Sequence, residues 1–175
     1  MAALFYYAVR FQARDRYSLA LQVLDQALVR GMEYVMSKIS PEAGTLITRY
    51  RQVCMELHRA YGFVRFSPAG HHTMVGRAEF THDITDLVLN YFAGRYSDCI
   101  IALIVKDMAY VLEKGKYTVS PADTLTAGQP EDMFTAYWEA YYDSQVIAGR
   151  SNKKLARKHL PRRYWSWVQE GWKLK

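Results

Sequence analysis

Residues 99–120 read CIIALIVKDMAYVLEKGKYTVS, and they are the stretch that decides the fold. Residues 99–107 form the most apolar run of the chain, and their β-branched side chains favour a central strand that is buried on both faces. Residues 108–120 predict the next antiparallel strand, with Lys114-Gly115-Lys116 as a turn or bulge. The sequence therefore predicts a sheet that other elements cover.

A second pair of strands precedes this run. Residues 63–67 alternate between the two faces of a strand, and residues 73–80 predict its neighbour. Residues 68–72 lie between them and contain a proline and a glycine, so residues 63–80 predict a hairpin. Residues 4–11 are aromatic and β-prone, and they are compatible with either a strand or a helix.

Helical spacing marks the rest of the first half of the chain. Residues 14–38 predict a helix that Gly31 can divide, on the spacing of Tyr17, Leu21, Leu24 and Leu28. Residues 41–61 predict an amphipathic helix with Ser40 as N-cap and Pro41 at its first position. Gly62 stands where a terminal glycine ends a helix. The polar face of this second helix is predicted to carry Arg49, Arg51, Glu56 and Arg59.

Further helices are predicted from Asp83 to about Gly94 and from Pro130 to about Ala148. Strands thus come in neighbouring pairs and do not alternate singly with helices, which favours an α+β fold over a doubly wound parallel sheet. We predict a single domain over residues 1–175, with a small antiparallel sheet of about four to five strands packed by helices. A basic, Trp-rich helical segment, residues 150–175, is expected to dock on this domain.

The charge of the molecule resides in that segment. Residues 150–175 hold nine Lys or Arg against Glu170, a net charge of +8, so residues 1–149 hold −2 of the total of +6. Such an asymmetry concerns partners and not the fold. Cations that neutralise phosphates release counterions, so nucleic acid or another polyanion is one interpretation. A solubilising surface or a helical cap packed by its tryptophans is the other.

Pro161 is expected to divide the segment into two helices. In the first helix the cations share one face, and Leu155 and Leu160 are predicted to point inward. In the second, Trp165, Val168 and Trp172 have helical spacing and are predicted to anchor the segment to the core. The side chains left for nucleic acid, together with Arg65 on the first strand, are Lys153, Lys154, Arg157, Lys158, His159, Arg162 and Arg163.

Glu79, His82 and Asp83 place two acids and an imidazole at one strand-to-helix junction. In one interpretation Glu79 orients His82, which acts as an acid or base or holds a phosphate. In the other, Asp83 or Thr81 caps the helix and His82 fills a polar pocket. The sequence has neither a glycine-rich phosphate loop nor ligand spacing typical of zinc, so we predict no metal and no cofactor. Whether the protein is an enzyme stays open.

Cys54 and Cys99 are interpreted as buried free thiols, since they lack redox or metal-binding spacing. No apolar run approaches the roughly 20 residues of a membrane span. The protein is expected to be soluble and cytoplasmic, with no membrane partner.

Three motifs of the chain resemble the DNA metabolism protein family, a DUF4130-like domain of unknown function. They are His58-Arg59-x-x-Gly62-Phe63-Val64-Arg65-Phe66, Glu79-x-x-His82-Asp83-Ile84, and Ser151-Asn152-x-x-Leu155 followed by Leu160-Pro161-x-Arg163-Tyr164-Trp165. The resemblance covers roughly residues 45–170. It implies a role in DNA repair or modification beside a radical SAM protein or a uracil-DNA glycosylase-like protein.

Three hypotheses about the function are therefore compatible with the sequence. The first is a DNA-binding accessory of a repair or modification pathway, which uses the basic segment and docks an enzyme partner. The second is an enzyme acting on a nucleotide or DNA base, with Glu79 and His82 in a cleft bordered by Arg65 and Arg163. The third is a scaffold whose tyrosine-rich surface binds a partner protein.

Overall fold

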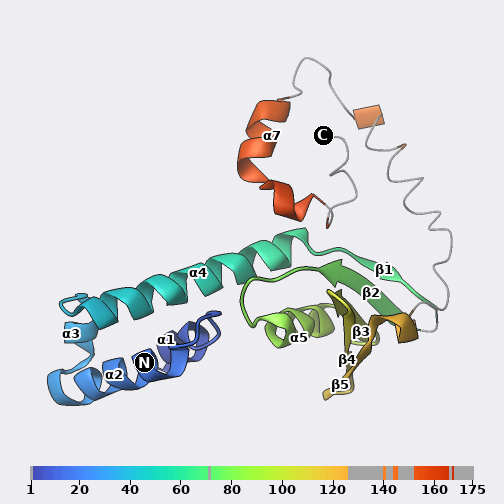
Figure 1. Cartoon of the computed structure of the whole chain (residues 1–175). Helices are drawn as coiled ribbons and strands as arrows, with labels where there is room; N and C mark the ends of the chain where they lie inside the picture. The colour runs from blue at the N-terminus through green and yellow to red at the C-terminus, as the bar shows by residue number, and fades with distance from the viewer. Residues whose placement is uncertain are drawn as a thin grey trace. The chain divides into compact units, whose positions relative to one another are not determined.

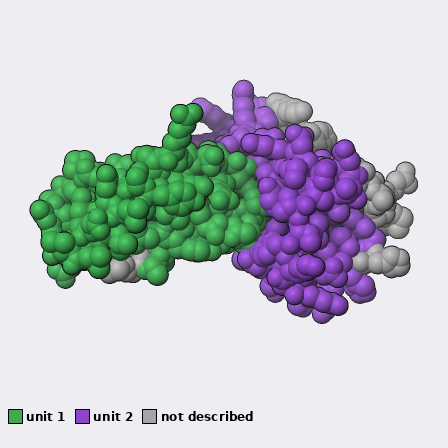
Figure 2. All heavy atoms as spheres, turned by 60° about the horizontal axis from the view of Figure 1, so that its bottom comes forward, with its two compact units in different colours: residues 1–62, 80–88 green, residues 63–79, 89–175 purple. Residues whose placement is uncertain are grey.

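The structure of the protein is a computed structural model that describes residues 2–70, 72–125, 140, 144–145, 152–165 and 167 (Figure 1). The chain forms two compact units (Figure 2). Unit 1 comprises residues 1–62 and 80–88, and unit 2 comprises residues 63–79 and 89–175. Unit 1 is helical, whereas unit 2 holds the sheet. Most of the helix predicted for residues 130–148 lies outside the described residues.

Unit 1 contains α1 (Ala2–Ala8), α2 (Arg16–Arg30), α3 (Met32–Met36), most of α4 (Pro41–Phe63) and the first turn of α5 (Thr85–Arg95). Residues 2–8 thus form a helix and not a strand. Gly31 divides α2 from α3 as predicted, with a φ of 83° that favours glycine. The core of these helices consists of Leu4, Ala8, Leu19, Val23, Ala27, Val35, Ala43, Leu46 and Ile47.

Helix α2 packs on this core with a different face from the apolar stripe whose spacing predicted the helix. Leu19, Val23 and Ala27 are buried. Tyr17, Leu21 and Leu28 are exposed. The helix carries two apolar stripes, and packing uses the one with the smaller side chains.

Helix α4 begins as predicted. The Ser40 hydroxyl accepts a hydrogen bond from the Ala43 N–H at 3.1 Å and donates one to Gln26 Oε1 at 2.6 Å. This N-cap is buried, so water cannot replace the lost acceptor. The prediction that Gly62 ends the helix is wrong, because α4 continues to Phe63.

Replacement of Ser40 with alanine is expected to lower the free energy of unfolding by about 1–2 kcal/mol. The variant leaves the Ala43 N–H and the Gln26 amide without their shared partner. Urea unfolding followed by circular dichroism measures the change. Thr45→Ala is the control, since its exposed hydroxyl bonds only the Pro41 carbonyl of the same helix. Equal losses for the two variants would contradict the capping role.

The described part of unit 2 contains a five-stranded sheet in the order β1-β2-β3-β4-β5. The strands are β1 (Phe66–Pro68), β2 (Thr73–Ala78), β3 (Ile100–Val105), β4 (Met108–Glu113) and β5 (Lys116–Pro121). The α+β class and the number of strands are as predicted. Strand β3 is central, and residues 101–104 are all buried, which confirms the prediction for the apolar run.

The sheet is mixed and not purely antiparallel. Strands β2 and β3 pair in parallel, whereas the other three pairings are antiparallel. The connection between β2 and β3 contains α5 (Thr85–Arg95), which returns the chain to the end of the sheet where β2 began. A tight turn would have given an antiparallel pair, so the helix decides the pairing.

Residues 108–120 form two strands that a two-residue turn joins. Lys114 and Gly115 have φ values of 47° and 79°, the positive angles that a twisted hairpin turn requires at both positions. The turn allowed by the sequence is therefore the one observed. A 3-10 helix, η1 (Ala122–Leu125), follows β5 directly.

Gly76 makes room for an aromatic ring on the sheet. It lies opposite Phe66 in the β1–β2 pair, and a Cβ at Gly76 would come within 3.1 Å of the Phe66 ring. The Phe66 ring in turn contacts the Phe92 ring of α5, with the ring centroids 4.5 Å apart. This contact joins the hairpin to the C-terminal half of α5.

Within the described residues, no helix combines the length and the hydropathy that crossing a membrane requires.

Candidate nucleic-acid interface

The described part of the C-terminal region forms a short basic helix and a 3-10 turn. Helix α7 (Lys153–His159) is capped by Asn152, whose side-chain oxygen accepts a hydrogen bond from the Leu155 N–H at 2.9 Å. It ends before Pro161, as predicted, and η3 (Arg162–Tyr164) follows. Cations in the last turn of α7 interact favourably with its dipole. We call residues 152–165 the basic segment.

Aromatic side chains hold the basic segment in the core of unit 2. Tyr164 has no exposed surface, and its ring contacts those of Phe63 and Trp167 at centroid distances of 5.3 and 4.7 Å. Trp167 is also buried. Trp165 is half-buried, and its indole N–H donates to the Leu160 carbonyl at 2.9 Å. The segment is thus a built part of its unit.

Leu155 departs from prediction. It was expected to point inward, but it is 50% exposed. Leu160 is half-buried. The anchoring comes instead from the aromatic residues that follow Pro161, because α7 is only two turns long and its own apolar side chains are too few to bury a face. Val168 and Trp172 lie outside the described residues.

The predicted cations of the basic segment reach the surface. The exposed residues are Lys154, Arg157, Lys158, His159, Arg162 and Arg163, and the side chain of Lys153 lies outside the described part of the structure. On a helix, residues three and four apart have Cβ atoms about 5–6 Å apart, so Lys154, Arg157 and Lys158 lie close to one another. Arg65, which precedes β1 in the same unit, is exposed as well.

The two arginines of η3 lie against aromatic rings. The Arg162 guanidinium is 5.8 Å from the centre of the Trp165 ring, and that of Arg163 is 4.6 Å from the centre of the Tyr164 ring. Arg163 also donates a hydrogen bond to the Tyr164 hydroxyl. Such contacts restrict the side chains before any ligand binds, which lowers the entropy lost on binding.

The predicted catalytic pair is divided between the two units. Glu79 is exposed at the end of β2 in unit 2, and His82 is half-buried in unit 1. The His82 ring lies against the Phe11 ring with the centroids 4.6 Å apart, and its Nδ1 accepts a hydrogen bond from the Gln12 N–H at 3.4 Å. These contacts agree with a structural role for His82. A catalytic role for Glu79 and His82 stays a prediction.

Glu56 is the acid that binds this junction, and the sequence interpretation missed it. Its carboxylate accepts hydrogen bonds from the Thr81 N–H at 3.0 Å and from the His82 N–H at 2.9 Å. The side chain was predicted on the polar face of α4, but Glu56 is 4% exposed. Its position three residues after buried Val53 and four before buried Ala60 is the signal that could have located it.

Arg10, which follows α1 by two residues, also binds the segment that precedes and begins α5. Its guanidinium makes two parallel hydrogen bonds to the Asp86 carboxylate, at 2.6 and 2.8 Å, and a third to the Asp83 carbonyl. The Asp83 N–H returns a hydrogen bond to the Arg10 carbonyl. Burial acts to lower the pKa of Arg10, but the Asp86 carboxylate and the Tyr6 hydroxyl together outweigh it and the pKa is raised. The junction is therefore held on two sides by charged partners.

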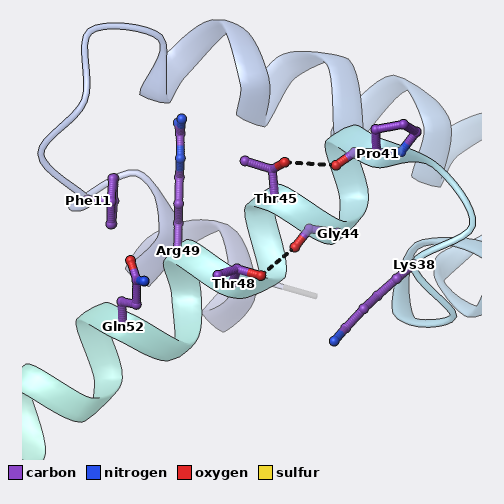
Figure 3. A pocket seen from close by; sticks show the side chains of 8 residues that line it. All are labelled: Phe11, Lys38, Pro41, Gly44, Thr45, Thr48, Arg49 and Gln52. Atoms are coloured by element: carbon purple, nitrogen blue, oxygen red, sulfur yellow. Dashed lines mark hydrogen bonds between the residues drawn. The ribbon is translucent and has the colours of Figure 1, made fainter.

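A hollow of about 560 Å³ lies along the N-terminal half of α4 (Figure 3). Figure 3 shows that the tips of Lys38 and Arg49 lie far apart, so its two cations do not converge on one ligand. Arg49 bonds Asp15 at 2.9 Å, which lowers the pKa of that carboxyl. The hydroxyls of Thr45 and Thr48 donate to carbonyls of their own helix. We assign no ligand to this hollow.

The cysteines are free, and both are half-buried and not fully buried as predicted. Burial raises the pKa of the Cys54 thiol, and the hydrogen bond with Tyr50 opposes this effect.

The fold and the exposed cations define an α+β protein with an anchored basic segment. A family model described as a domain of unknown function, DUF4130, matches residues 14–170. The chain belongs to this family. No curated protein matches the chain, and no solved structure does.

Proposed function

We propose that this protein is a DNA-binding accessory of a repair or modification pathway. The observation that carries the proposal is the exposure of six cationic or imidazole side chains on the basic segment, while Tyr164 of the same segment is buried. A solubilising surface needs no such anchoring. Cations on a fixed scaffold can meet successive phosphates without first being ordered.

The local charge supports a polyanion as the partner. Residues 150–175 carry a net charge of +8, and the basic segment, residues 152–165, contains no acid. The surface therefore attracts phosphates without a like-charged group among these residues to repel them. The family resemblance supports DNA as the polyanion and a radical SAM protein or a uracil-DNA glycosylase-like protein as the enzyme partner.

Salt-dependent binding of the full chain tests the proposal. If about five phosphates are contacted on duplex DNA, log K is expected to fall against log salt with a slope of about −4 to −5. Fluorescence anisotropy with a duplex, the matching single strand and a uracil-containing duplex measures the slope and the preference. A slope near zero, or no binding at low salt, would contradict DNA binding. Equal affinity for the uracil-containing and normal duplexes would contradict recognition of uracil but not binding to the DNA backbone.

A further inference from the structure

Helix α2 displays an apolar stripe that the fold of unit 1 leaves uncovered. Tyr17, Leu21 and Leu28 are 59%, 62% and 72% exposed, and Leu24 between them is half-buried. At about 100° of rotation per residue, these four side chains fall within about 60° of one another on the helix. The opposite side of α2 packs on the core beside α4, to which Arg49–Asp15 and Gln26–Glu42 contacts tie it (Figure 1). Exposed apolar residues are common singly, but a row of them marks an interaction surface.

The spacing of the stripe indicates a helix as its partner. Its residues are separated by four, three and four positions, which is the spacing of the apolar positions in a coiled coil. Such a row presents side chains that insert between those of a second helix with the same spacing. The stripe contains no charged residue, so a polyanion is not its ligand.

We propose that this stripe pairs with the same stripe of a second copy of the chain, in the antiparallel direction. A two-fold axis between Leu21 and Leu24 places Tyr17 against Leu28 of the second copy and Leu21 against its Leu24. Every apolar side chain then meets an apolar side chain, and the interface is closed by symmetry. This inference is independent of DNA binding.

The helix dipoles favour the antiparallel direction over the parallel one. Each helix carries partial positive charge at its N-terminus and partial negative charge at its C-terminus, and antiparallel pairing places these opposite charges side by side. Asp25 is exposed on the flank of the stripe, and Ser18 of the second copy lies nearest to it in this arrangement.

The area matches a weak, reversible dimer. The exposed parts of the stripe amount to roughly 400 Å² of apolar surface in each copy, and a polar rim that includes Arg14, Ser18 and Asp25 brings the total for two copies to roughly 1,000 Å². Specific interfaces begin at about this size. We therefore expect a dissociation constant of about 10–100 μM for the dimer, which is typical of small contacts.

Sedimentation velocity of the full chain from 5 to 200 μM, in about 0.3 M salt to suppress charge-driven association, tests the dimer. The wild-type chain is expected to shift from monomer to dimer across this range. Leu21→Glu is expected to weaken the dimer by tenfold or more, because the carboxylate would be buried against apolar side chains. Gln22→Glu is the matched control, since the same residue is introduced one position along the helix and about 100° away from the stripe. It should leave the dimer unchanged.

The direction is tested by cross-linking with a short thiol-reactive reagent. A mixture of Tyr17→Cys and Leu28→Cys chains should yield more linked dimer than either variant alone, with the parent chain as background for Cys54 and Cys99. Efficient linking by each variant alone would overturn the antiparallel arrangement. A wild-type chain that is monomeric at 200 μM would overturn the dimer and leave the stripe to a different protein. Lower thermal stability of Leu21→Glu than of Gln22→Glu at 5 μM would show that the stripe is packed within the monomer and would overturn the proposal as well.

Discussion

Replacement of Glu56 with alanine is expected to lower the free energy of unfolding of unit 1 by about 3 kcal/mol, which is roughly a 150-fold change in the unfolding equilibrium. The substitution leaves the N–H groups of Thr81 and His82 without their acceptor. Hydrogen bonds to a carboxylate contribute about 1.5–3 kcal/mol each, and the Glu56 carboxylate that accepts these two is buried. Glu56→Gln keeps one acceptor oxygen, so its free energy of unfolding should fall by about half as much.

Urea unfolding measures the stability, and hydrogen exchange of peptides that span residues 79–86 measures the local effect. These amides should exchange faster in Glu56→Ala, while peptides from α7 should not change. Gln52→Ala is the control, because Gln52 is an exposed residue on the same helix with a side chain of similar size. If Glu56→Ala and Gln52→Ala lose the same stability, the carboxylate does not hold the junction.

Reversal of charge at Lys154, Lys158 and Arg162 is expected to reduce affinity for duplex DNA by about a hundredfold at 0.1 M salt and to flatten the salt slope from about −4.5 to about −2. Each phosphate contact contributes about 0.9 to the slope, so three lost contacts remove about 2.7. All three side chains are exposed, so the substitution by glutamate should not unfold the unit. Deletion of residues 150–175 is a poorer test because it removes the buried Tyr164 and Trp167 from the core.

A second triple variant separates a local site from net charge. Lys106, Lys114 and Lys116 are exposed near the turns of the sheet, away from the basic segment in the chain. Both triple variants change the net charge from +6 by three times −2, to zero. The variant of the sheet turns should keep a slope near that of the wild type. Equal losses in the two variants would show that overall charge, and not the basic segment, drives the binding.

The helix starts and the central strand could be predicted because their causes are local. Ser40 and Pro41 define the start of α4 by their own chemistry, and the β-branched run at residues 100–105 is too apolar to lie anywhere but inside. Pro161 ends α7 for a local steric reason, because its ring disfavours the helical conformation of Leu160, which is extended. These features follow from the nearest few residues.

The candidate site was predictable in its composition but not in its geometry. The cations of the basic segment could be named, since lysine and arginine stay at surfaces in most contexts. The sequence did not show which aromatic residue anchors the segment. Tyr164, and not Trp165, is fully buried, and its ring packs on that of Phe63.

The amino-acid sequence by itself determined the α+β class, the start of α4, the central strand, the hairpin turns and the charge of the C-terminal segment, because these depend on side-chain chemistry over a few positions. The tertiary structure alone decided which stripe of α2 is buried, that Glu56 lies inside, and that β2 and β3 run in parallel. In each of these three cases the local sequence is compatible with two arrangements, the observed one and its alternative. Contacts between residues distant in the chain supply the free energy that separates them.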